Sequence, residues 1–315
     1  MSNLLTVSPS PHIRSPRTTT SIMATVLLAL FPAALLSVVL FGFRAFLILL
    51  VANLACGLLE YGWCRLTKNQ NTVPDLSCFV TGTLLALTLP ANFGEWKNLW
   101  MIAVGSVIAI IIVKEFFGGI GYNFANPAIT ARIAMLVCFP DLMTETVHTN
   151  FTNVELSSGA TPLGDIAAGK AELLPDWIQM FFGNHAGAIG EVSAFALLVG
   201  GIILIATKTI TWHIPVSFIA TVGLFTLFTG AYPSYQLIAG GLFIGAFFMA
   251  TDYVTSPDTA LGKVVFGIGC GLITALIRVY GGYPEGVSFA ILLMNILNPY
   301  IIKLTRKKAF GGIKV

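Results

Sequence analysis

The sequence predicts an all-α polytopic membrane protein with about ten transmembrane helices, arranged as two inverted five-helix repeats. Composition gives the class, because the 315 residues are 56% hydrophobic and only 10% charged, whereas soluble domains are about 25% charged. Apolar runs of spanning length recur on both sides of one long polar segment, and the second set resembles the first. We therefore expect an integral membrane protein whose helices are related in two groups.

The elements follow in order from the apolar runs. Residues 1–21 are polar and basic and lead into an apolar run without a small-residue cleavage site, which predicts a cytoplasmic N-terminus and an uncleaved first span. The expected spans lie near 22–40, 43–63, 76–90, 98–117, 123–139, 187–206, 211–230, 236–252, 262–280 and 286–303. They divide the chain into a first repeat over 22–139, an extracytoplasmic loop over 140–186, a second repeat over 187–303 and a basic cytoplasmic tail over 304–315.

The distribution of charge sets the expected orientation. This topology places most basic residues in the cytoplasm, namely Arg14, Arg17, Arg65, Lys68, Lys114, Lys208, Lys263, Lys303, Arg306, Lys307, Lys308 and Lys314, and leaves Arg44, Lys97, Lys170 and Arg278 at the other face. The 140–186 loop is acidic and is expected to face outward. Nucleic-acid binding is disfavoured, because no second basic region accompanies the tail.

The cysteines do not predict a metal site in this chain. Five are present, none in a Cys-x-x-Cys pair, and all lie in or beside apolar runs. We expect small buried side chains; donation of one cysteine to a site shared with another subunit stays open. We also expect no catalytic residue.

A shift of 163 residues aligns the two halves. It lays Gly82 on Gly245, Thr88 on Thr251, and the glycine pair 118–119 on the pair 281–282. With five spans in each copy, the second copy enters the membrane from the opposite side, and such inverted repeats place a binding site at their interface near the membrane midplane. Coincidence between two glycine-rich apolar stretches is the alternative.

Two segments, one in each predicted repeat, carry the candidate polar residues of that interface. Segment 114–132 contains glycines that permit tight turns, followed by Asn123, Asn126 and, inside the next span, Arg132. Segment 249–263 contains Thr251 and Asp252 at the end of an apolar span. These five residues are candidate contacts to a cofactor or ion; a structural turn with a snorkelling arginine, and a helix capped by Ser256 before Pro257, are the alternatives.

A third segment, 278–298, is polar within its span. Glu285 stands at a predicted helix start, where a carboxylate suits the helix dipole. Asn295 and Asn298 lie inside the last span, and buried amides need partners. We expect them to bridge helices more often than to contact a ligand.

The outer loop contains E-L-S-S-G-A-T over 155–161. Ser158, Gly159, Ala160 and Thr161 form the motif that a flavin transferase reads when it joins the phosphate of FMN to a threonine hydroxyl. Thr161 before Pro162 is also a good helix N-cap, and the two interpretations are compatible. A threonine ester of FMN indicates electron transfer.

Together these segments resemble the family of RnfD subunits of Rnf ferredoxin:NAD oxidoreductases and of B subunits of sodium-pumping NADH:quinone oxidoreductases. The resemblance covers nearly the whole chain and rests on G-G-I-G-Y-N-F-A-N-P-A (118–128), S-G-A-T-P-L (158–163), M-A-T-D-Y-V-T-S-P (249–257) and Y-P-E-G-V-S-F-A-I-L-L-M-N (283–295). The chain departs from the family pattern at Glu155, where Asp is usual, and at Tyr253, where Pro is common.

The resemblance implies a subunit of an ion-translocating translocase with little activity alone. It implies FMN on Thr161, a second, non-covalent riboflavin, coupling to Na⁺ or H⁺, and partner subunits of the A, B, C, E and G types, besides membrane lipid. The repeat by itself would also suit a channel or carrier for a small neutral solute, of the urea-transporter type. Thr161 discriminates between the redox subunit and the solute channel, because such a channel has no use for a flavin attachment motif.

Overall fold

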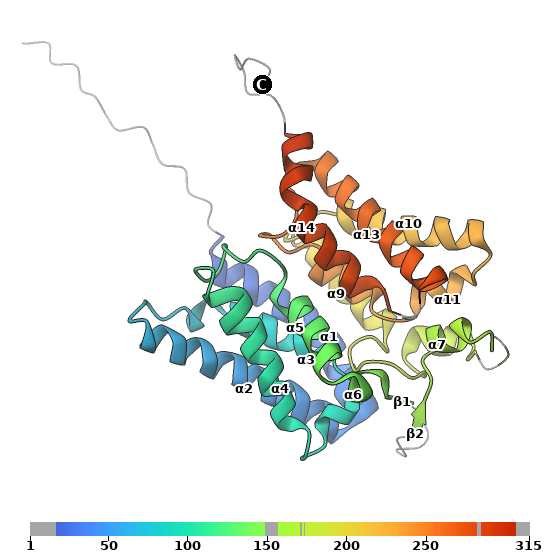
Figure 1. Ribbon diagram of the computed structural model, residues 1–315, viewed down its shortest axis with the longest axis horizontal. Coiled ribbons are helices and arrows are strands. Elements are labelled where there is room, and N and C mark those ends of the chain that lie inside the picture. Colours follow the sequence, from blue (N-terminus) through green and yellow to red (C-terminus); the bar gives the residue numbers. More distant parts are fainter. Residues whose placement is uncertain (1–16, 149–156, 171, 173, 282–284, 307–315) are drawn as a thin grey trace, which may run out of the picture.

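The computed structural model describes residues 17–148, 157–170, 172, 174–281 and 285–306, and these are mostly helical (Figure 1). Among them, four helices are long and apolar enough to cross a membrane: α1 (Thr19–Phe41), α2 (Phe43–Leu66), α13 (Ala260–Tyr280) and α14 (Val287–Thr305). The shorter apolar helices are α3 (Ser77–Leu87), α5 (Pro127–Cys138), α9 (Ala194–Ala206) and α10 (His213–Thr229). The chain is a polytopic membrane protein, while the count of ten spans stays a prediction.

Short elements complete the first half. They are the 3₁₀ turns η1 (Val73–Asp75) and η2 (Ala91–Gly94), helix α4 (Leu99–Val107) and the π-helix η3 (Ile108–Glu115). Helix α4 and η3 together occupy the predicted span 98–117. The helix ends there because Gly118, Gly119 and Gly121 take φ values of 114°, 88° and 94°, a backbone region that glycine adopts without strain.

The segment between the halves differs from the all-α expectation. It contains helices α6 (Pro140–Thr144), α7 (Pro162–Ala167) and α8 (Trp177–Phe182), and a two-stranded antiparallel sheet of β1 (Thr146–His148) and β2 (Ser157–Gly159). In its register, Thr146 pairs with Gly159. Three-residue strands in a polar segment carry too little hydrophobic alternation to be recognised in a sequence.

Two predicted spans of the second half are wrong as continuous helices. Helix α9 begins only at Ala194, because residues 187–193 lie against the end of α3, where the N–H of Gly190 donates to the carbonyl of Leu87 at 2.8 Å. The predicted span 236–252 is divided into α11 (Pro233–Ile238), α12 (Leu242–Ile244) and the π-helix η5 (Gly245–Met249). The carbonyls freed at that break bind the guanidinium of Arg278.

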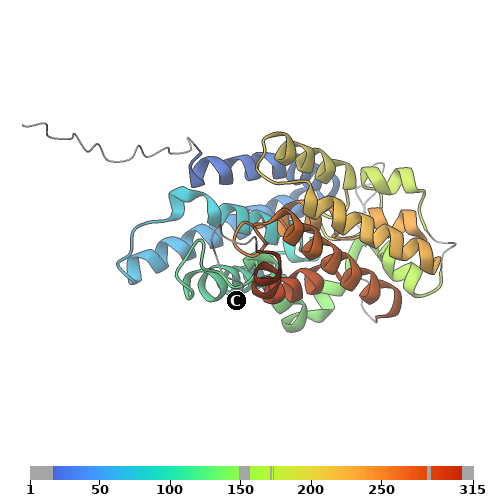
Figure 2. The same ribbon diagram turned by 90° about the horizontal axis from the view of Figure 1, so that it is seen from above.

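One apolar core joins the two halves. It combines Ala29 and Leu84 of the first half with Leu197, Phe247 and Met294 of the second half. Helices α1 and α9 pack side by side, as seen from above in Figure 2. The polar segments described next therefore lie between two halves that share a core.

Candidate functional site

The non-helical segments 116–126 and 250–259 meet at the interface of the halves, as the sequence predicts, with a hydrogen bond between the side chains of Asn123 and Asp252. Asn126 Nδ2 donates to the carbonyl of Met249 at 3.1 Å, and Asn126 Oδ1 caps α5 through two backbone N–H groups. In the orientation that satisfies both ends of its amide, Asn295 accepts from the N–H of Asn126 at 3.1 Å. The predicted role of Asn295 as a bridge between helices is confirmed.

A cavity of about 390 Å³ opens at this junction; we call it the Asp252 cavity. Its lining includes the predicted residues Asn123, Asn126, Thr251 and Asp252, with apolar walls from Met23, Val26, Leu84, Phe247 and Phe248. Asp252 accepts from the hydroxyl of Thr255 at 3.0 Å and is hydrogen-bonded by Asn123. The predicted N-cap at Ser256 is wrong, because α13 begins at Ala260 with Thr259 as its cap.

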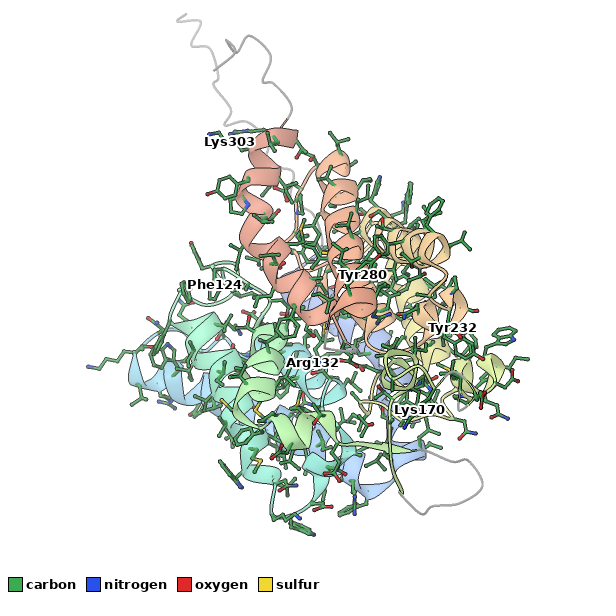
Figure 3. The ribbon with its side chains drawn as sticks, turned by 45° about the vertical axis from the view of Figure 1, so that its right-hand side comes forward. Phe124, Arg132, Lys170, Tyr232, Tyr280 and Lys303 are labelled. Carbon is green, nitrogen blue, oxygen red and sulfur yellow. The ribbon has the colours of Figure 1, made fainter. Side chains whose placement is uncertain are left out.

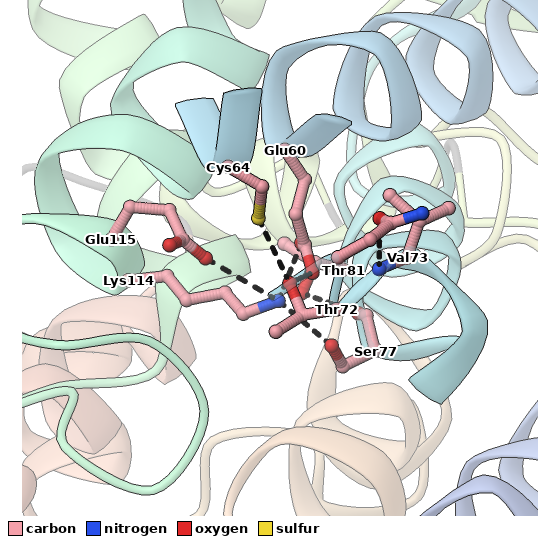
Figure 4. A network of polar contacts seen from close by, with 9 residues as sticks. Glu60, Cys64, Thr72, Val73, Ser77, Thr81, Lys114 and Glu115 are labelled. Atoms are coloured by element: carbon pink, nitrogen blue, oxygen red, sulfur yellow. Dashed lines mark hydrogen bonds and ion pairs between the residues drawn. The ribbon is translucent and has the colours of Figure 1, made fainter. Parts of the chain in front are cut away.

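The sequence placed Lys114 among the cytoplasmic basic residues, but the structure buries its side chain. Only 3% of Lys114 is exposed, and its ammonium lies 2.5 Å from Glu60 Oε2 and 2.7 Å from Ser77 Oγ (Figure 4). Glu60 Oε1 accepts from Thr72 at 2.6 Å. Lys114 and Ser77 also line the Asp252 cavity. The signal available in the sequence was Glu60 itself, a carboxylate inside a predicted span.

A second cavity, of about 230 Å³, contains Thr161 in its lining together with Ala160, Thr88 and Thr146; we call it the Thr161 cavity. Thr161 caps α7, because its Oγ1 accepts from the N–H of Gly164 at 3.1 Å. The preceding residues are held by the β1–β2 sheet, where the hydroxyl of Thr146 donates to the carbonyl of Gly159 at 2.7 Å. The N-cap interpretation of Thr161 is therefore confirmed, and it leaves flavin attachment open.

Arg132 lies where α5 faces the second half (Figure 3). It is 9% exposed, lines the Thr161 cavity and pairs through Nη1 with Glu191 and through Nη2 with Glu285. Glu285 precedes α14 and binds Arg132 in addition to standing near the helix start. The expectation that Arg132 would be paired or line a polar cavity is confirmed on both counts.

The structure divides the predicted site residues between the two cavities. Asn123, Asn126, Thr251 and Asp252 line the first, whereas Arg132, Ala160 and Thr161 line the second. The backbone of Ser158 and Gly159 forms strand β2 beside the second cavity, and Glu155 lies outside the described residues. Sequence reasoning missed Glu191, although a carboxylate inside the predicted span 187–206 was a signal for it.

Comparison with known proteins identifies the family. The family model described as "NQR2, RnfD, RnfE family" matches residues 6–311. The chain belongs to this family. It is 44% identical over 99% of its length to the D subunit of the Na(+)-translocating ferredoxin:NAD(+) oxidoreductase complex of Acetobacterium woodii, covering 96% of that protein. It is 42% identical over 98% of its length to the D subunit of the proton-translocating ferredoxin:NAD(+) oxidoreductase complex of Clostridium ljungdahlii, covering 97% of it.

A more distant relative extends the family match. The D subunit of the ion-translocating oxidoreductase complex of Escherichia coli is 34% identical over 98% of this chain and 99% of its own length. The resemblance predicted from the four motifs is thus confirmed over nearly the whole chain. In this NQR2, RnfD, RnfE family member, the two cavities are the sites to which the predicted cofactor residues converge.

Proposed function

We propose that this chain is the D subunit of an ion-translocating ferredoxin:NAD⁺ oxidoreductase complex, and that it relays electrons through FMN joined to Thr161. Two facts support the proposal: relatives similar over their whole lengths bear that name, and S-G-A-T stands at 158–161. The relay is coupled to movement of Na⁺ or H⁺. A relay needs a donor and an acceptor in neighbouring subunits, so the isolated chain should have little activity.

The observation that carries the FMN assignment is the position of Thr161. Its half-buried side chain lines a cavity that also offers the apolar side chains of Ile133 and Leu136 and the guanidinium of Arg132, which is paired with Glu191 and Glu285. A flat aromatic ring system with polar edges suits such a lining. The residues present therefore fit FMN: Thr161 would hold its phosphate, and the cavity walls would orient the ring. FMN supplies the capacity to accept and release electrons.

A second flavin, riboflavin, is proposed for the Asp252 cavity. The larger volume, the aromatic walls of Phe247 and Phe248, and the polar side chains of Asn123 and Asp252 support this assignment. The two cavities lie along the same helices, because Leu84 and Ala128 line one while Thr88 and Arg132 line the other. Four residues of an α-helix rise about 6 Å, so ligands in both cavities would be close enough to exchange electrons directly.

The proposed arrangement in the membrane follows the charge pattern. We place both termini in the cytoplasm, the 140–186 segment outside, and the chain in a bacterial inner membrane beside subunits of the A, B, C, E and G types. The inverted repeat is supported by a parallel between α3 and the pair α12–η5, which the shift of 163 residues superposes. Each is a short helix, and each is followed by a non-helical segment.

The test is the substitution Thr161→Ala in chain produced together with a flavin transferase. Only a hydroxyl can form the phosphoester, so the flavin fluorescence that survives denaturing electrophoresis should be lost entirely. Thr259→Ala is the matched control, because Thr259 caps α13 in the same way, through Gly262 N–H at 3.0 Å, yet lies outside the Thr161 cavity. Loss of either cap costs about 0.5–2 kcal/mol, and both variants should keep the membrane fold.

Mass spectrometry of the peptide over residues 155–170 completes the test. A mass increase on Thr161 in the unaltered chain is expected, and its absence would overturn the FMN assignment and return the solute-channel hypothesis. Retention of the fluorescent band in Thr161→Ala would move the attachment to another hydroxyl.

A further inference from the structure

One side of the Thr161 cavity holds a cluster in which a single guanidinium serves two carboxyl groups. Arg132 from α5 donates to Glu191 and to Glu285, and the two carboxyl groups lie within hydrogen-bonding reach of one another. Arg278 at the end of α13 is the other cation facing them, but both of its Nη atoms are bound by backbone carbonyls of α11 and its C-cap. Among the described residues, the ion pairs of this cluster thus join one cation to two carboxyl groups.

Glu191 is the member of the cluster placed to bind a proton. Its side chain is 1% exposed, and its Oε2 atom has no hydrogen-bond partner among the described residues. A buried carboxylate oxygen without a donor is unfavourable, and protonation removes the charge and supplies a donor. Glu285 is more exposed, with 27% of its side chain accessible, and it lines the Thr161 cavity. It therefore connects Glu191 to water that enters the cavity.

We propose that the Arg132–Glu191–Glu285 cluster is a proton-binding site that takes up one proton when the cofactor on Thr161 gains one electron. With both carboxyl groups ionised, the three side chains carry a net charge of −1. A further negative charge arriving in the same cavity is repelled strongly, because the surroundings are poorly polarisable. A proton on Glu191 offsets that repulsion. Uptake of the electron therefore favours uptake of the proton, and uptake of the proton favours uptake of the electron.

The exchange balances without breaking a bond in the cofactor. The electron comes from a one-electron carrier of a neighbouring subunit, such as an iron–sulfur centre or a flavin, and the proton comes from cavity water through Glu285. When the electron leaves, the proton returns by the same route. This inference rests on the proposed attachment of FMN to Thr161. The experiment below distinguishes a failure of the inference from a failure of that proposed attachment.

Infrared difference spectroscopy of electrochemically reduced protein tests the inference. The full chain, carrying its covalent flavin in membranes, should gain a carboxylic acid C=O band on reduction. Glu191→Gln, which has the same shape but cannot change charge, should lose that band and should weaken the dependence of the flavin midpoint potential on pH. Glu191→Asp keeps a carboxyl group, so it should retain a band at a shifted frequency.

Glu95→Gln is the matched control, since Glu95 forms partly exposed ion pairs with Arg44 and Lys97 and does not line the Thr161 cavity. It should leave both the infrared band and the pH dependence unchanged. A band of equal size in the unaltered chain and in Glu191→Gln would overturn the inference, and so would flavin-bearing protein without any such band. Protein that carries no covalent flavin would instead overturn the proposed function.

Discussion

At the scale of single residues, several charged side chains of this membrane protein are buried and paired with one another. Lys114 and Glu60 form an ion pair with side-chain exposures of 4% and 0%, and Arg132 serves two acids beside the Thr161 cavity. Each charge in such a pair is expensive to bury alone, so removing one partner costs more than the pair contributes. These side chains are therefore fixed by one another, which keeps the walls of both cavities in place.

The pair Lys114–Glu60 gives a prediction at this scale. Lys114→Met should lower the free energy of unfolding by about 3–5 kcal/mol, because Glu60 is left without its cation. The double variant Lys114→Met with Glu60→Leu should recover part of that loss, since the charge on Glu60 is removed together with its cation. The recovery should be incomplete, because Glu115, whose carboxylate lies 3.9 Å from the Lys114 ammonium, also loses its cation. Thermal unfolding in detergent measures the stability of the single and the double variant. Arg44→Gln, which breaks a partly exposed pair with Glu95, should cost only about 0–1 kcal/mol. Equal losses at the two sites would contradict the argument.

At the scale of elements, the helices of the two halves depend on close approach as well as on apolar area. A Cβ atom added at Gly200 of α9 would lie 2.2 Å from the carbonyl oxygen of Ala29 on α1. Because both atoms belong to packed helices, neither can move aside without shifting a helix. The contact between α1 and α9 therefore requires a residue without a side chain at position 200.

Gly200→Ala tests this contact. The substitution should destabilise the protein by about 1–3 kcal/mol through overpacking, despite the better helix propensity of alanine. Gly62→Ala in α2 is the control, because a Cβ there meets nothing within 4 Å; it should stabilise by about 0.5–1 kcal/mol. We expect the two substitutions to change the free energy of unfolding in detergent with opposite signs. A gain in stability at both positions would refute the close approach of α1 and α9.

The elements also show which parts of the site were predictable. The sequence identified Asn123, Asn126, Thr251 and Asp252 as a group, because helix-breaking residues follow an apolar run in each half of the chain. It could not assign Arg132 to the other cavity, since this depends on which face of α5 turns toward the second half. The buried role of Lys114 was missed, because a lysine near the end of a span resembles a snorkelling residue, although Glu60 inside another predicted span called for a cationic partner.

At the scale of the whole molecule, the charge pattern predicts the orientation in the membrane. Reporter domains fused after Lys170 and after Val315 should report opposite compartments, with the second in the cytoplasm, because basic residues are retained on the cytoplasmic side. Arg17 and Lys208 were predicted to share that side, and their neighbourhood agrees: Arg17 donates to the carbonyl of Lys208 at 3.0 Å. Reporters on the same side would refute the ten-span topology.

The sequence by itself determined the class of protein, the family and the motifs, because hydrophobicity and short motifs are local properties of the chain. Only the tertiary structure decided how the polar residues are grouped. Arg132 belongs to the first half, whereas Glu191 and Glu285 come from opposite ends of the second half, and they meet because the two halves pack around one core. Buried charges must find partners wherever packing brings them, and no local pattern records which partner that will be.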